Sequence, residues 1–157
     1  MDTLAPGAWI ADWLWGLPLI VLASIIHVLG FWTIEIGVDS GLRHGGLWRS
    51  PRVTFAVVVG STVLAATVLH AIEATVWAGA YLWLGALPDG RSAMLYSIGA
   101  MTTFGHANLR LADEWQMLGA LEALNGMLLF GLTTAFLYAA IQKVRAVIFR
   151  EYGAIRR

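Results

Sequence analysis

The chain has 157 residues, of which 59% are hydrophobic and 13% charged, and its mean hydropathy is +0.71. An apolar share this far above that of a soluble domain indicates an integral membrane protein with one membrane domain. Zero net charge argues against nucleic acid as a partner, and the absence of cysteine excludes disulfides and thiolate metal sites.

Residues 1 to 13 carry two acidic side chains and no basic one, so they lack the basic start of a cleavable signal peptide. We expect an exposed tail whose tryptophans settle at the membrane interface. The run from Leu14 to Val38 is long enough for the ~20 residues of a spanning helix. Residues 39 to 52 hold three glycines, a proline and three arginines, which is typical of a short connecting loop.

The second apolar segment runs from Val53 to Ala86, and a Pro-Asp-Gly turn follows it. Arg91 to Met101 then predicts a helix too short to cross a bilayer, and Trp115 to Phe149 predicts a third span. Between these two helices lies the polar stretch Thr102 to Asn108. Irregular backbone survives at membrane depth only where protein buries it or where it lines a water-filled path. The sequence therefore predicts a re-entrant helix and a loop that faces ions.

Basic residues mark the orientation. Eight of the ten Lys and Arg lie in the 39 to 52 loop and at the C-terminal end. Cytoplasmic segments carry such an excess, so we expect the C-terminus inside and both the N-terminus and residues 87 to 114 outside. The expected location is the cell (inner) membrane, which the chain crosses several times.

The Thr-Thr-x-Gly stretch, a tryptophan some ten residues later and a glycine-bearing helix resemble the pore module of potassium channels. Further motifs extend the resemblance over residues 55 to 142, to small bacterial channels of the two-pore-domain type: His70-Ala-Ile-Glu73 with Trp77, Ala93-Met-Leu-Tyr96-Ser97, and Leu121-Glu122-Ala-Leu-Asn125-Gly126.

The resemblance implies an all-α homotetramer in the lipid bilayer that conducts monovalent cations and is not an enzyme. Residues 1 to 52 would form a tail, a leading helix and a cytoplasmic loop. Residues 53 to 149 would form the pore module of outer helix, pore helix, filter and inner helix, followed by a short basic tail at 150 to 157. The expected ions are K⁺ and Na⁺, with no other metal or cofactor.

The filter itself departs from the Thr-x-Gly-Tyr-Gly-Asp of the family. Thr103, Phe104 and Gly105 match its first half and follow Thr102, whereas His106, Ala107 and Asn108 replace its second half. An L-residue in left-handed backbone costs roughly 1 to 2 kcal/mol, so we expect Ala107 to distort the outer ion sites and to weaken K⁺ selectivity. His106 either packs behind the filter, which we prefer, or titrates or binds metal at the axis.

Polar residues on the spans are expected to support this filter. His70, Glu73 and Trp77 share one helix face, and charged groups at such depth mark partners or function. We predict a hydrogen-bond frame that also includes Tyr96, Ser97, Glu122 and Asn125. On the inner helix, the predicted hinge and cavity residues are Gly126, Gly131, Thr133 and Thr134.

Two alternatives stay open. The first is a haem-binding or quinone-linked membrane subunit in which His27 and His70 are axial ligands. The second is a scaffold derived from a channel that no longer conducts.

Overall fold

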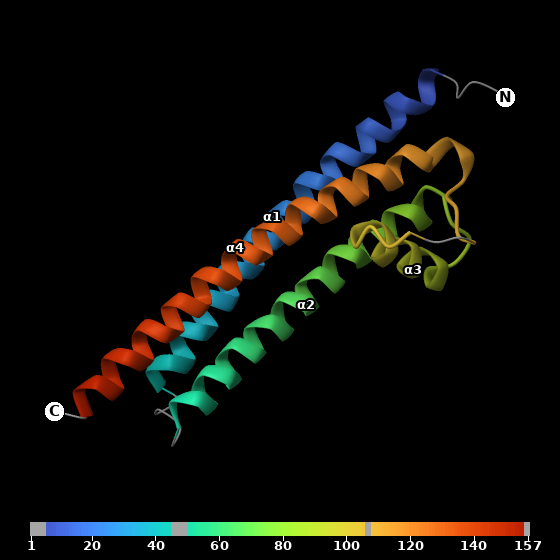
Figure 1. Ribbon diagram of the computed structural model, residues 1–157. Helices are drawn as coiled ribbons and strands as arrows, with labels where there is room; N and C mark the ends of the chain where they lie inside the picture. Colours follow the sequence, from blue (N-terminus) through green and yellow to red (C-terminus); the bar gives the residue numbers. More distant parts are fainter. Residues whose placement is uncertain (1–5, 45–49, 106–107, 156–157) are drawn as a thin grey trace. The chain divides into compact units, whose positions relative to one another are not determined.

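The computed structural model describes residues 6–44, 50–105 and 108–155. This part of the chain is all-helical, and Figure 1 shows its elements in order. They are α1 (Pro6–His44), α2 (Pro51–Trp83), α3 (Gly90–Met101), the 3-10 turn η1 (Asp113–Trp115) and α4 (Gln116–Ile155). Helices α1, α2 and α4 contain stretches long and apolar enough to cross a membrane. The predictions of an all-helical fold and of three helices long and apolar enough to span a membrane are therefore confirmed for the described residues.

The helix limits correct two expectations. Helix α1 begins at Pro6, so the predicted exposed tail is helical from that residue onward, and Asp12 within it is buried. The predicted loop at 39 to 52 is shorter at both ends, because α1 continues to His44 and α2 begins at Pro51. Both helices start on a proline, whose fixed φ and missing N–H suit the first helical position.

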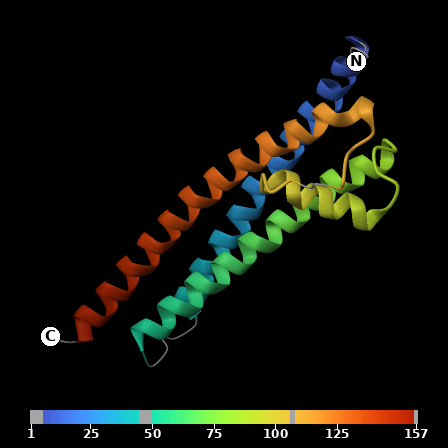
Figure 2. The same ribbon diagram turned by 45° about the vertical axis from the view of Figure 1, so that its right-hand side comes forward.

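The chain packs as two units. The first consists of Met1–His27 and His70–Phe130, and the second of Val28–Leu69 and Gly131–Arg157. In the first unit the largest fully buried side chains are those of Trp77, Tyr81, Leu118 and Leu129. Helix α3 belongs to this unit and lies beside the C-terminal end of α2, as Figure 2 shows.

The N-terminus of α3 is capped by Asp89. Its Oδ1 accepts hydrogen bonds from the backbone N–H groups of Arg91 and Ser92, both at 3.0 Å, and its Oδ2 accepts one from the Ser92 hydroxyl at 2.7 Å. These bonds, those of Ser92 above all, lower the pKa of the exposed Asp89 carboxyl. The predicted Pro-Asp-Gly turn therefore both ends the preceding segment and starts this helix.

The second unit has an apolar core and a charged cluster. Val38, Val144 and Ile148 are buried together. Lys143 Nζ lies 2.7 Å from Asp39 Oδ1 and 3.1 Å from Glu35 Oε1. This pairing gives partners to the one charge, Glu35, that interrupts the first apolar run of the sequence.

Two glycines of α4 make a matched pair for testing how closely α3 packs. A Cβ added at Gly126 would overlap the backbone of Met101, 2.7 Å from its Cα, whereas one at Gly131 would meet nothing within 4 Å. We expect Gly126→Ala to destabilise the protein by about 1 to 3 kcal/mol, as overpacking does. Gly131→Ala should be neutral or stabilising by up to about 1 kcal/mol, because alanine favours the helix.

Thermal unfolding of the two variants in detergent measures the difference. Equal midpoints for Gly126→Ala and Gly131→Ala would contradict the close contact between α3 and α4.

Candidate functional site

The loop after α3 contains two residues in left-handed backbone. Thr103 has φ 56° and Gly105 has φ 68°. The loop folds back on the helix end, because the N–H of Thr103 donates to Ala100 O at 2.9 Å and that of Gly105 donates to Gly99 O at 3.1 Å. A β-branched residue with positive φ is an outlier, and such strain clusters at functional sites. No sequence pattern predicts that Thr103 takes this conformation.

The loop is open to its surroundings in the single chain. Residues 102 to 105 and Asn108 are exposed, and Phe104 is 83% exposed. A hollow of about 450 Å³ adjoins the loop, with Thr103, Gly105 and Arg110 in its lining beside residues of α3 and α4. His106 and Ala107, which carry the predicted distortion of the outer filter, lie outside the described residues.

A buried carboxyl joins three helices behind this loop. Glu122 of α4 is fully buried. The Tyr81 hydroxyl of α2 donates to its Oε2 at 2.5 Å, and the Ser97 hydroxyl of α3 donates to its Oε1. Ser97 Oγ also lies 2.8 Å from the carbonyl oxygen of Ala74 on α2. The side chain of Glu122 therefore connects α2, α3 and α4 through hydrogen bonds.

The predicted frame is present only in part. Glu122 and Ser97 meet as expected, and Tyr96 packs edge-on against Tyr81 with ring centroids 5.4 Å apart. Asn125 is fully buried, but neither of its amide atoms has a hydrogen-bond partner among the residues that the structure describes. Trp77 is buried in the same unit, and its Nε1 also has no partner in that part of the chain.

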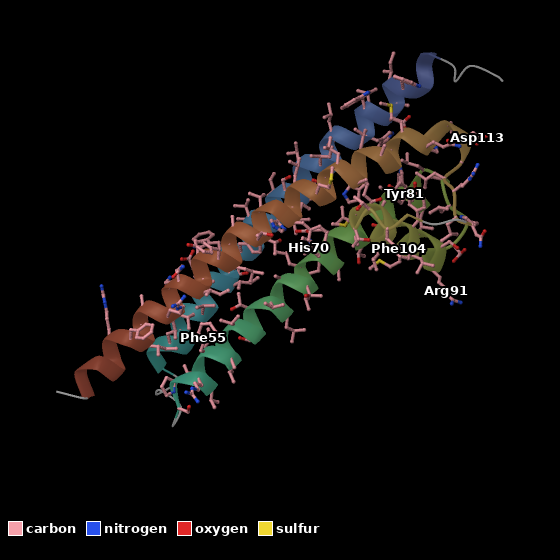
Figure 3. The ribbon with its side chains drawn as sticks, in the orientation of Figure 1. Phe55, His70, Tyr81, Arg91, Phe104 and Asp113 are labelled. Atoms are coloured by element: carbon pink, nitrogen blue, oxygen red, sulfur yellow. The ribbon has the colours of Figure 1, made fainter. Side chains whose placement is uncertain are left out.

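Sequence reasoning missed Tyr81 as a member of this frame. The signal was available, because Tyr81 follows Glu73 and Trp77 at successive steps of four residues and so shares their helix face. Figure 3 labels Tyr81 and His70 on α2.

A second polar cluster forms around Glu73. His27 Nδ1 of α1 lies 2.7 Å from Glu73 Oε1, and His70 Nδ1 lies 3.0 Å from Glu73 Oε2. His27 and Glu73 are fully buried, and the side chain of His70 is 14% exposed. His70 also stacks on Phe130 with ring centroids 4.4 Å apart. The pairing of His70 with Glu73 follows from their spacing, whereas the approach of His27 from another helix does not.

The predicted hinge and cavity residues of α4 differ in their surroundings. Gly126 packs on the backbone of Met101, and the position of Gly131 is open. Thr133 is buried and Thr134 is exposed. Their roles in bending or in lining a cavity stay predictions.

No family model, curated protein or solved structure matches the chain. The resemblance to potassium channels therefore rests on the sequence motifs alone.

The bonds of Glu122 predict how it tolerates substitution. In Glu122→Gln, the amide oxygen can accept from Tyr81 and the amide nitrogen can donate to Ser97, whose hydroxyl still reaches Ala74 O. We expect this change to lower the free energy of unfolding by less than about 1 kcal/mol. Glu122→Ala leaves the buried Tyr81 hydroxyl unpaired and opens a cavity, so it should lower that energy by about 1 to 3 kcal/mol or more.

Denaturation in mixed detergent compares the two variants, with Glu114→Ala, a change at an exposed acid in η1, as the control. An alanine variant at position 122 that is as stable as the control would show that Glu122 does not hold the three helices.

Proposed function

We propose that the protein is the subunit of a homotetrameric cation channel in the inner membrane, with residues Thr102 to Asn108 lining the ion path. The N-terminus faces outward and the C-terminus faces the cytoplasm. The channel passes K⁺ and Na⁺ with weaker discrimination than an intact potassium filter provides. The observation that carries the proposal is the short helix α3 with the loop that follows it. The loop is exposed and contains two residues of positive φ. Helix α3 is hydrogen-bonded through Ser97 to the buried carboxyl of Glu122.

The length of α3 supports a re-entrant arrangement. Its 12 residues extend about 18 Å at 1.5 Å per residue, which is well short of the ~30 Å hydrocarbon core. A helix of this length at membrane depth leaves its C-terminal end and the following loop inside the bilayer. The C-terminus of a helix carries a partial negative charge, which favours a nearby cation.

The exposure of the loop supports assembly around an axis. The N–H groups of Thr102, Thr103 and Gly105 are bonded to α3, but lipid cannot satisfy the exposed backbone carbonyls of such a loop, so water or protein has to surround them. Four copies around a closed axis supply both, because neighbouring subunits cover the sides of the loop while its inner edge lines a path. Most soluble homo-oligomers close in this symmetric manner, and a pore formed by one loop per chain needs the same closure.

The hydrogen bonds of Glu122 to Tyr81 and Ser97, which we call the Glu122 frame, favour a loop of fixed position. The family filter has a tyrosine and an aspartate as side-chain anchors, which His106 and Asn108 replace here. Ser97 lies about one and a half helical turns before Thr102. Its hydrogen bond to Glu122 therefore anchors the C-terminal part of α3 to α4. The position of the inner half, Thr102 to Gly105, then depends on α3 rather than on the substituted outer half.

The geometry of the histidines argues against haem. Axial ligands have to face each other across a porphyrin, whereas His27 and His70 both direct Nδ1 at the same carboxylate of Glu73. A porphyrin between the rings would displace that carboxylate. An absorption spectrum of the purified protein without a Soret band is the outcome that fits this argument.

Reconstitution into liposomes tests the channel directly. We expect passage of both K⁺ and Na⁺, with a permeability ratio below that of a channel with an intact filter. Gly105→Ala should reduce the flux at least tenfold, because the strain of roughly 1 to 2 kcal/mol at a left-handed position recurs in all four subunits. Gly79→Ala on α2, where an added Cβ would also meet nothing within 4 Å, is the matched control and should leave the flux unchanged.

A folded tetramer that passes neither ion would favour the non-conducting scaffold. A permeability ratio as high as that of an intact-filter channel would contradict weakened selectivity.

A further inference from the structure

The cluster of His27, His70 and Glu73 is separate from the pore loop and from the Glu122 frame. One ligand atom from each of the three side chains lies within 4.8 Å of the others. We propose that this cluster binds a divalent transition-metal ion, with Zn²⁺ as the representative, through the two imidazoles and the carboxylate. Such a site revises the expectation that the protein holds no metal beyond permeant ions.

The donor set fits that class of ion. Two imidazoles and one carboxylate bind zinc in sites that keep a fourth position open, and the same set binds other divalent ions of the first transition row. Hard ions such as Mg²⁺ and Ca²⁺ prefer sites made of oxygen ligands. The ligands therefore select against Mg²⁺ and Ca²⁺.

The distances are close to those of a metal site. Ligand atoms 2.0 to 2.1 Å from a tetrahedral zinc are about 3.3 Å apart. The nitrogen-to-oxygen distances here are 2.7 Å from His27 to Oε1 and 3.0 Å from His70 to Oε2, shorter than in a metal site, as hydrogen bonds require, and one ligand atom from each side chain lies within 4.8 Å of the others. The three side chains are therefore near enough to converge on one ion after their rings and carboxylate reorient.

The protonation of the two rings also allows a metal ion to replace these hydrogen bonds. An ionised Glu73 carboxylate can only accept hydrogen bonds, which requires a proton on Nδ1 of each ring that bonds to it. Metal binding requires that nitrogen to be unprotonated, and a neutral ring satisfies this by carrying its proton on Nε2 instead. The change of tautomer leaves the charge of each neutral ring unaltered.

The surroundings favour a bound cation and hold the ligands in place. Glu73 lies fully buried on a helix apolar enough to span the membrane, where a carboxylate needs a partner of opposite charge. Stacking on Phe130 fixes the ring of His70, whose side chain is 14% exposed. Because His27 is on α1 and the other ligands are on α2, the ion would link these two helices.

Metal binding by the full-length protein in detergent tests the site. The other two histidines are first removed in a His44→Gln/His106→Gln background, which excludes binding at the pore axis or at the end of α1. After chelation, equilibrium dialysis should then show one Zn²⁺ per chain, and Co²⁺ should give the visible absorption of a site with nitrogen and oxygen ligands. In the same background, His27→Gln, His70→Gln and Glu73→Gln should each weaken Zn²⁺ binding at least tenfold.

Circular dichroism and the elution volume establish that each variant is folded. If Glu73→Gln or His27→Gln fails to fold, the partly exposed His70→Gln decides alone. Absence of Zn²⁺ from the background protein, or equal retention by folded His70→Gln, would overturn the proposal and leave a hydrogen-bonded triad. Because the readout is bound metal, it is independent of whether the protein conducts ions.

Discussion

The hydrogen bonds of Glu122 are the interaction on which the rest of the candidate site depends. Helix α3 has 12 residues and is too short to span a bilayer. Apolar packing alone does little to select one apolar surface over another in lipid. A carboxyl of α4 that accepts from Tyr81 of α2 and from Ser97 of α3 has a definite geometry. The contact between Gly126 and the Met101 backbone then sets how near α3 lies to α4.

These contacts of α3 also restrict the position of the loop that follows it. The end of α3 is fixed at Ser97 and Met101, and residues 103 and 105 fold back on it through hydrogen bonds to Ala100 and Gly99. Thr103 is held in left-handed backbone against its preference, which requires that the surrounding bonds outweigh the strain. Under the proposed function, such a loop keeps Thr102 to Gly105 in place even though His106 and Asn108 replace the side-chain anchors of the family filter.

The sequence was most informative where local signals agree. The apolar runs predicted three spans, and the Pro-Asp-Gly turn before a short apolar run predicted α3 to within one residue. The start of α1 was missed because charged and small residues at 1 to 13 resemble a tail, whereas the burial of Asp12 depends on packing that no local pattern reveals.

The same limit applies to the polar residues. Spacing within α2 paired His70 with Glu73, whereas the sequence brought His27 together with His70 only in the haem alternative, which did not include Glu73. Glu122 and Asn125 share a helix face three residues apart. Glu122 accepts a hydrogen bond from Tyr81, whereas Asn125 has no hydrogen-bond partner among the described residues. The difference depends on which side chains of the neighbouring helices lie opposite each position, and spacing within α4 does not reveal that.

The central claim is that Thr102 to Asn108 line an ion path of which only the inner half is intact. A density map of the assembled protein in K⁺ solution tests it most directly. The account predicts four chains around an axis, with ion peaks beside residues 102 to 105 and none beside 106 to 108. A map in which residues 102 to 108 lie away from any symmetry axis, or in which no ion peak adjoins them, would contradict it.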